Sequence, residues 1–242
     1  MRRLLHVLFG LYAILVFAMC VLFSLFVAVL VPGLERRRRL VAGAARASFL
    51  LSGVRPDITG LNNLPDQACV VVANHASYLD GILLKGFLPA RFSFVIKGEM
   101  RDVPIAHFLM RRSGARFVER FKSSESARDA RQIVKAARSG ESLGFFPEGT
   151  FIAEPGVGRF RAGAFMAAIK GGMPVVPIAI AGTREMLGAG RTLPQPAPIR
   201  VDILPPILPD DPAYGNHHTL AETARQRILS VLDEPDLLAT LD

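Results

Sequence analysis

The stretch from Cys69 to Asp80 reads CVVVANHASYLD, an apolar run that passes directly into polar, turn-forming residues. A short apolar run bounded by turn residues predicts a buried strand. Such a strand delivers the polar side chains that follow it to one edge of a sheet, which is where open α/β folds bind ligands. His75 and Asp80 lie in this polar part. A histidine held by a carboxylate can take a proton from an alcohol, because it titrates near neutral pH.

Short apolar runs alternate with helical stretches from Asp57 onward. Strands are predicted at 69–73, 92–96, 116–118, 143–146, 175–181 and 199–204. Helices are predicted at 80–87, 105–112, 124–138, 162–170 and 219–232. This alternation favours an α/β fold with a mostly parallel central sheet covered by helices. The proline-rich stretch 193–212 should wrap the surface around its one short strand.

The N-terminal residues are strongly apolar. From Leu4 to Val31 the chain has no Asp, Glu, Lys or Arg. A helix over this run would be about 40 Å long, enough to cross a hydrocarbon core of about 30 Å, and Pro32-Gly33 would end it. We expect a retained membrane anchor, because the run is too long for a signal peptide and lacks a small-residue cleavage pattern. Residues 1–54 are thus predicted to be a membrane-anchoring segment and residues 55–242 the α/β domain.

Two topologies are open for this anchor. The arginine run from Arg36 to Arg39 outnumbers the arginines before the apolar helix, so the positive-inside rule would place the bulk of the chain in the cytoplasm. Positive charge at both ends also fits a helix that enters one leaflet and returns. Residues 40–54 are again apolar and could form a second helix along the interface. The arginine run itself is interpreted as stop-transfer charge, with binding of anionic lipid in addition.

The composition limits the classes of function. The chain has 242 residues, 50% of them hydrophobic, with a mean hydropathy of +0.33 and a formal net charge of +8. Such a charge attracts anionic lipid or nucleic acid, but no nucleic-acid recognition motif is present, and nucleic acid is not an expected partner. The two cysteines, Cys20 and Cys69, do not form a disulfide framework. No His, Asp and Glu cluster has metal-ligand spacing, so no metal is expected.

Residues 146–150 read FPEGT and form a second polar cluster after an apolar run. Glu148 beside a buried strand end needs a partner, and a ligand hydroxyl would serve. Gly149 allows close backbone approach, and Thr150 adds a donor. The alternative is a turn that merely caps the strand.

Three cations are further candidates. Arg161 lies just before a predicted helix, where two nearby arginines could bind an anion, although a solvated basic loop also fits. Lys97 and Arg120 each follow a predicted strand, and each alone is typical of a surface charge.

Taken together and in this order, these residues resemble the glycerolipid acyltransferase family, which includes the 1-acyl-sn-glycerol-3-phosphate (lysophosphatidic acid) acyltransferases. That family is marked by an N-H-x4-D block, a G-x-x-F-x-x-R block, an F-P-E-G-T block and a V-P-I/V block. The blocks in this chain are Asn74-His75 with Asp80, Gly114 with Phe117 and Arg120, residues 146–150, and Val176-Pro177-Ile178. The resemblance covers most of the chain and leaves the C-terminal region weakly supported.

The resemblance implies that a fatty acyl group moves from acyl-CoA or acyl carrier protein to the free hydroxyl of a lysolipid, with no cofactor beyond that thioester. It implies that His75 is the general base and that Asp80 orients it. The implied substrate-binding residues are Asn74, Lys97, Arg120, Glu148, Gly149, Thr150 and Arg161. Such an enzyme would act on membrane lipids at the cytoplasmic face of the inner or plasma membrane.

Phe151 departs from the family pattern, in which Arg or Ser usually follows the Glu-Gly-Thr residues. Arginine there would suit bidentate phosphate binding, and phenylalanine cannot provide it. Another cation could supply the charge, or the acceptor is a different lysolipid or lipid alcohol. Thioester hydrolysis and a non-catalytic lipid-binding protein of the same fold are the remaining alternatives.

Overall fold

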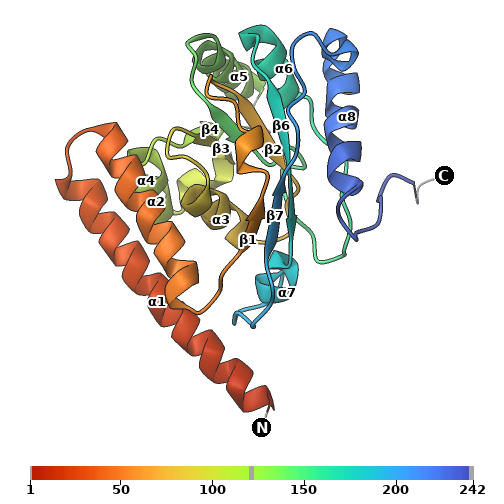
Figure 1. The fold of residues 1–242 in the computed structure, drawn as a ribbon. Helices are drawn as coiled ribbons and strands as arrows, with labels where there is room; N and C mark the ends of the chain where they lie inside the picture. The colour runs from red at the N-terminus through yellow and green to blue at the C-terminus, as the bar shows by residue number, and fades with distance from the viewer. Residues whose placement is uncertain (1, 120–122, 240–242) are drawn as a thin grey trace.

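The computed structural model of the chain describes residues 2–119 and 123–239. Within them, seven strands form one sheet in the order β1-β7-β6-β2-β5-β3-β4 (Figure 1). The strands are β1 (Asp57–Thr59), β2 (Val70–Ala73), β3 (Ser93–Lys97), β4 (Arg116–Val118), β5 (Leu143–Phe145), β6 (Val175–Ala181) and β7 (Arg200–Ile203). Paired strands are parallel except β6 and β7, so the mostly parallel sheet is confirmed.

Strand β1 is not predicted by the sequence patterns. Its three residues alternate between exposed and partly exposed, so no apolar run marks it. It pairs in parallel with β7, and these two strands run opposite to the other five of the described sheet. The carboxyl ends of β2, β3, β4, β5 and β6 therefore lie at one common edge.

Helices cover both faces of the sheet (Figure 1). They are α1 (Arg2–Leu30), α2 (Leu34–Leu51), α3 (Leu79–Phe87), α4 (Pro104–Arg112), α5 (Ser123–Arg138), α6 (Gly163–Gly171), α7 (Thr183–Leu187) and α8 (His217–Leu229). The helices predicted in the α/β domain are confirmed within a few residues at either end. Helix α7 is too short to show a helical period, and the sequence does not predict it.

Strand β2 is buried on both faces, which explains its continuous apolar run. Val70 and Val72 pack with residues of α5, α6 and α8, whereas Val71 and Ala73 pack with residues of α2, α3 and α7. All four side chains are at most 1% exposed. The strand that leads to His75 is thus fixed in the centre of the core.

Helices α1 and α2 form a pair that lies side by side (Figure 1). Pro32 and Gly33 separate them as predicted, and Gly33 adopts a left-handed φ of 82° at this turn. A second helix is therefore confirmed, but it begins at Leu34 and not at residue 40. Arginine, leucine and glutamate are good helix formers, so the arginine run belongs to the helix instead of flanking it.

Two arginines of this run form intramolecular contacts with the α/β domain. The Nε of Arg37 donates a hydrogen bond to the carbonyl of Arg112 at 2.9 Å. The side chain of Arg38 is only 13% exposed and forms an ion pair with Glu141 at 3.2 Å. The other two arginines of the run are exposed. The run therefore contributes to the contact between α2 and the α/β domain, which its interpretation as stop-transfer charge does not anticipate.

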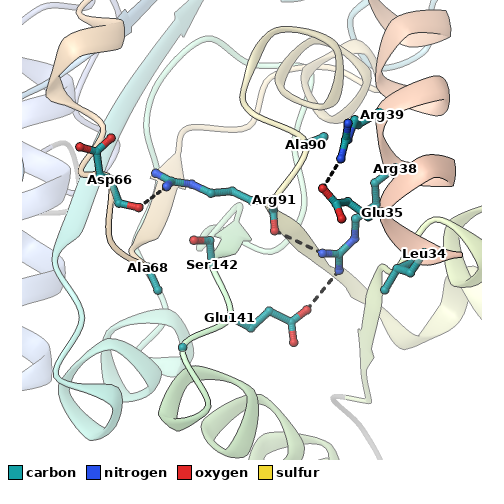
Figure 2. Close-up of a pocket in the computed structure, with 11 residues that line it drawn as sticks. Leu34, Glu35, Arg38, Arg39, Asp66, Ala68, Ala90, Arg91, Glu141 and Ser142 are labelled. Carbon is teal, nitrogen blue, oxygen red and sulfur yellow. Dashed lines mark hydrogen bonds and ion pairs between the residues drawn. The ribbon is translucent and has the colours of Figure 1, made fainter.

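A cavity of about 750 Å³ lies near the edge where β2, β3 and β5 begin, opposite the edge that carries His75. Figure 2 shows Arg38 reaching from α2 to the carbonyl of Arg91 and the carboxylate of Glu141. Arg91 in turn donates to the carbonyl of Asp66 at 2.5 Å. The predicted site residues do not line this cavity. Its charges hold α2 against the loops that precede the strands.

Glu141→Gln is expected to destabilise the fold by about 1–3 kcal/mol, because it weakens two ion pairs at a mostly buried carboxylate. Burial alone would raise the pKa of Glu141, but hydrogen bonds from Arg116 and Ser93 and the charges of Arg116 and Arg38 outweigh burial and lower it. When folding lowers the pKa of a carboxyl group, the ionised group stabilises the fold at pH values above its unfolded-state pKa. This stabilisation is lost as the pH falls through the folded-state pKa. The variant should therefore lose less stability on acidification than the wild type.

Chemical denaturation in detergent, from about pH 7 to about pH 3, measures both effects. Glu35→Gln is the matched control, since it breaks an exposed ion pair with Arg39 and should cost well under 1 kcal/mol. Equal acid sensitivity of wild type and Glu141→Gln would contradict this role of the network.

Candidate active site

The turn after β2 is fixed to the neighbouring strand by Asn74. Its side-chain amide nitrogen donates to the carbonyl of Ile180 at 2.9 Å, and its oxygen accepts from the Ile180 N–H at 2.8 Å. Asn74 is 2% exposed, so these bonds satisfy a buried amide. The amide thus extends the pairing of β2 and β6 by one residue and sets the direction in which His75 leaves the sheet.

His75 and Asp80 are in direct contact. Asp80 is fully buried in the first turn of α3, and its Oδ2 lies 2.8 Å from Nδ1 of His75. The same oxygen accepts hydrogen bonds from the backbone N–H of Ala76 at 2.7 Å and of Ser77 at 2.8 Å. An acceptor-only carboxylate assigns the ring proton to Nδ1. Nε2 then carries the lone pair that can accept a proton.

Aromatic rings hold the imidazole on two sides. Phe146, which follows β5, stacks on His75 with a centroid separation of 4.3 Å. Phe151 approaches the same ring edge-on at 4.8 Å, and Tyr78 contacts Phe151 edge-on at 4.7 Å. Tyr78 is 68% exposed. The histidine therefore lies in an aromatic setting that opens to the surface beside Tyr78.

Glu148 has protein partners for both carboxylate oxygens. Oε1 accepts the backbone N–H of His75 at 2.8 Å, and Oε2 accepts that of Gly158 at 2.9 Å. Burial raises the pKa of Glu148 despite these two hydrogen bonds. The sequence leads us to expect a ligand hydroxyl as its partner, whereas the structure joins it to two backbone segments. Glu148 thereby connects the His75 turn to the loop after residue 150.

The other residues of the FPEGT turn are placed as follows. Gly149 is buried and has a φ of 85°, a left-handed conformation that disfavours a side chain. Its N–H donates to the carbonyl of Phe146 at 3.0 Å, which closes the turn. Thr150 is exposed. The turn thus offers one exposed hydroxyl next to the His75 region.

The two described candidate cations, Lys97 and Arg161, lie on different elements. The backbone N–H of Arg161 donates to the carbonyl of Pro147 at 2.9 Å, and its side chain is exposed beside the FPEGT turn. Lys97 is the exposed last residue of β3, two strand spacings from β2 and so on the order of 10 Å away. Arg120 lies outside the described residues.

Arg184 is a residue of this edge that the sequence interpretation does not include. It is the second residue of α7, the short helix that follows β6, and its guanidinium donates to the carbonyls of Ile152 and Glu154, each at 2.8 Å. It also pairs with Glu234 at 3.1 Å, and Glu234 accepts the N–H of Gly156 at 2.8 Å. These bonds hold the loop that carries Phe151. A cation shortly after a strand that ends at the ligand edge is a sequence feature from which Arg184 could have been predicted as a residue of this site. Nothing in the sequence connects Glu234 to this loop.

The fold and site together define an α/β protein with a histidine–aspartate pair at the carboxyl edge of its sheet. Residues 55–181 match the family model described as Acyltransferase, and the chain belongs to this family. The resemblance stated from the four sequence blocks is thereby confirmed.

Individual relatives agree with this assignment. The chain is 33% identical over 178 residues to the 1-acyl-sn-glycerol-3-phosphate acyltransferase BAT2, chloroplastic, of Brassica napus, covering 72% of this chain and 50% of that protein. It is 30% identical over 161 residues to the 1-acyl-sn-glycerol-3-phosphate acyltransferase of Pseudomonas aeruginosa, covering 64% and 62%. The crystal structure of the 1-acyl-sn-glycerophosphate acyltransferase from Thermotoga maritima superposes with a TM-score of 0.77 at 26% identity, covering 94% of this chain and 95% of that one.

Proposed function

We propose that this protein moves a fatty acyl group from a thioester to the free hydroxyl of 1-acylglycerol-3-phosphate, giving phosphatidic acid. The observation that carries the proposal is the His75–Asp80 pair, whose 2.8 Å contact leaves Nε2 free to accept the hydroxyl proton. The names of the relatives in Brassica napus and Pseudomonas aeruginosa support the choice of acceptor.

In this mechanism Nε2 of His75 removes the hydroxyl proton while the oxygen attacks the thioester carbonyl. The buried Asp80 carboxylate stabilises the imidazolium that forms, because the two groups are 2.8 Å apart and the Asp80 side chain is shielded from solvent. Collapse of the tetrahedral intermediate breaks the carbon–sulfur bond, and the imidazolium returns the proton to the leaving thiolate. The acceptor oxygen is itself the nucleophile, so no acyl-enzyme forms. Acyl-CoA and acyl carrier protein are both suitable donors, and no cofactor is required.

Binding of the acceptor would involve the exposed groups around the pair. Thr150 would donate to the glycerol part, while Arg161 and Lys97 would supply positive charge for the phosphate. The G-x-x-F-x-x-R block, which ends at Arg120, makes that arginine a further candidate for the phosphate. We assign Asn74, Gly149 and Glu148 to the positioning of the turns beside the acceptor, since their polar groups bond to backbone.

Phe151→Arg is expected to lower KM for lysophosphatidic acid about 5- to 10-fold relative to a lysolipid without a terminal phosphate monoester. A guanidinium at this position could form charge-assisted hydrogen bonds to the phosphate, which phenylalanine cannot. Steady-state acyl transfer with both acceptors, presented in mixed micelles, measures the ratio. Phe151→Leu is the control, because it removes the ring without adding charge. An unchanged KM ratio in the arginine variant would show that residue 151 does not contact the headgroup.

The proposed site requires access to membrane lipid, and α1 is suited to provide it. Helix α1 is the one described helix long and apolar enough to cross a membrane. Besides packing on α2, it contacts the α/β domain at two distant points. A Cβ at Gly10 would lie 2.9 Å from the carbonyl oxygen of Pro194, and the carbonyl of Ala28 accepts a hydrogen bond from Arg112 at 2.8 Å. These points are about 27 Å apart along the helix.

Because α1 contacts the α/β domain over about 27 Å of its length, it cannot at the same time span a hydrocarbon core of about 30 Å. We therefore propose that residues 1–54 anchor the protein in one leaflet and that residues 55–242 form the acyltransferase domain at the cytoplasmic face of the inner or plasma membrane. The outer side of α1 carries large exposed apolar side chains, among them Leu8, Leu15 and Leu22. Their burial in lipid would hold the domain at the surface.

The triple variant Leu8→Glu, Leu15→Glu, Leu22→Glu is expected to bind phospholipid vesicles at least tenfold more weakly than the wild type. Each leucine is more than half exposed, so the change removes lipid contacts without opening the core. Vesicle flotation measures binding, and the same three positions changed to methionine provide the control. Equal flotation of both variants would rule out this face of α1 as the anchor.

A further inference from the structure

The C-terminal residues contact the loop between the FPEGT turn and α6. The N–H of Val157 donates to the carbonyl of Pro235 at 3.0 Å, and the carbonyl of Val157 accepts the N–H of Leu237 at 3.3 Å. Val157 and Asp236 thereby form a parallel β-bridge. Because the side chain of Val157 is fully buried, it fixes this bridge to the core. The C-terminal partners all lie beyond residues 55–181, the segment that matches the family model.

A buried arginine of α8 adds a side-chain contact to this bridge. The side chain of Arg225 is 1% exposed, and its Nε donates to the carbonyl of Gly158 at 3.0 Å. The same guanidinium forms ion pairs with Glu222, at 2.8 Å, and with Asp236. We call Arg225 and residues 234–237 the C-terminal clamp. The guanidinium of the clamp therefore holds the loop and is itself held by a carboxylate of the clamp.

Gly158 connects the clamp to the candidate active site. Its carbonyl accepts from Arg225, while its N–H donates to Oε2 of Glu148 at 2.9 Å. Oε1 of Glu148 accepts the N–H of His75 at 2.8 Å. A Cβ at Gly158 would lie 3.2 Å from Oε2 of Glu148, so a larger residue would push the two groups apart. A continuous series of hydrogen bonds thus leads from the clamp to the main chain of His75.

The clamp also holds the part of the loop that contacts the His75 ring. Glu234 pairs with Arg184 at 3.1 Å, and Arg184 donates to the carbonyl of Ile152 at 2.8 Å. Ile152 directly follows Phe151, whose ring lies edge-on to the His75 ring with a centroid separation of 4.8 Å. The main chain and the ring of the histidine therefore both have contacts that depend on the clamp.

Stability alone does not account for the buried guanidinium. Moving charges out of water costs free energy, so replacing a buried ion pair with apolar side chains of similar volume is often neutral or stabilising. An apolar side chain at residue 225 could not supply the directional hydrogen bond to the carbonyl of Gly158. A misplacement of about 1 Å, caused by a change far from the reacting atoms, can lower a rate about 10²-fold. The hydrogen bond from Arg225 can therefore matter more for the rate than for stability.

We propose that the C-terminal clamp positions His75 for proton transfer, with Arg225 as its central positioning residue. This inference rests on the proposed acyl transfer and adds residues that act through the loop and not through the substrates. Arg225 contacts Gly158, whereas Thr150 and Arg161 are the groups of this region proposed to bind the acceptor. Loss of the clamp should therefore lower kcat and leave KM for the acceptor nearly unchanged.

The test replaces the buried ion pair with apolar side chains in the full-length protein in detergent. Arg225→Met/Asp236→Leu removes the hydrogen bond to Gly158 but fills the space, so thermal unfolding should occur close to the wild-type temperature. With lysophosphatidic acid and palmitoyl-CoA, kcat is expected to fall at least tenfold, while KM for the acceptor stays within about threefold. The matched control, Arg227→Met/Asp211→Leu, removes another ion pair of α8, at 3.6 Å, and should preserve both constants.

A conservative variant keeps the test decisive if the apolar variant does not fold. In Arg225→Lys the charge beside Asp236 remains, but lysine lacks the planar fork that bonds the loop and the acids together. Its kcat should lie between those of the wild type and the apolar variant, about threefold below the wild type.

Hydrogen exchange provides a measurement that does not depend on activity. In the apolar variant the N–H of His75 should exchange at least tenfold faster than in the wild type, since Glu148 is no longer held by a fixed Gly158 segment. The control variant should exchange at the wild-type rate. Mass spectrometry of the fragments that contain residue 75 measures the difference.

The outcomes separate the two proposals. A folded apolar variant with unchanged kcat, a loss confined to KM, or an equal loss in the control variant would each overturn the positioning role. If the apolar variant does not fold, unchanged kcat in Arg225→Lys would overturn it. Absence of acyl transfer by the wild type would count against the proposed function. The exchange rate of the His75 N–H would then still decide whether the clamp holds this turn, and an unchanged rate would overturn the clamp.

Discussion

His75→Ala should lower the rate of acyl transfer by at least 10²-fold and up to about 10⁴-fold, since it removes the proposed general base. His75 has a partly exposed ring whose Nδ1 contacts Asp80, and its main-chain N–H to Glu148 is kept in the alanine variant. The fold should therefore persist. Initial rates with saturating acceptor and donor measure the loss, and thermal unfolding in detergent checks that the variant is folded.

His107→Ala is the matched control for this experiment. His107 lies on α4 and packs edge-on against Phe117 at 4.9 Å, away from the Asp80 contact. Its loss should leave the transfer rate within a few-fold of the wild type. A folded His75→Ala protein with an unchanged rate would refute the mechanism.

Asp80→Asn is expected to cost on the order of 10²–10⁴-fold in kcat with little change in KM. An asparagine oxygen can still accept the N–H groups of Ala76 and Ser77, so the turn should remain closed. The neutral amide would no longer stabilise the imidazolium, and its NH₂ group can favour the wrong ring tautomer of His75. The loss therefore lies in the step that moves the proton.

The separate changes in kcat and KM distinguish this role from a structural one. Asp57→Asn, at the start of β1, removes an exposed carboxylate and should leave both constants unchanged. A large rise in KM with unchanged kcat for Asp80→Asn would indicate an acceptor-binding role instead.

Local patterns were sufficient to predict the centre of the site. The apolar run of β2, the turn at Asn74 and the helix that starts near Asp80 are adjacent in sequence, so their spacing predicts that the carboxylate folds back to His75. The same holds for α5, whose apolar spacing and final Gly140 give its limits closely. The start of α2 was misplaced because charged residues resemble a helix boundary although they are good helix formers.

Contacts between distant segments could not be predicted in this way. The partners of Glu148 are backbone N–H groups of His75 and Gly158, and no side-chain pattern reports where a backbone group will lie. The bond between Arg184 and Glu234 joins residues 50 positions apart through a C-terminal segment without a recognisable motif. Both connections depend on the three-dimensional course of loops, which periodicity does not encode.

The most direct measurement is the product balance of the wild-type protein incubated with lysophosphatidic acid and an acyl thioester. Mass spectrometry quantifies phosphatidic acid and free fatty acid, and a thiol reagent quantifies the released thiol. We predict one phosphatidic acid for each thiol released, with little free fatty acid. Thiol release matched by free fatty acid, without any new lipid, would identify thioester hydrolysis and contradict the central claim that the His75–Asp80 pair activates a lipid hydroxyl.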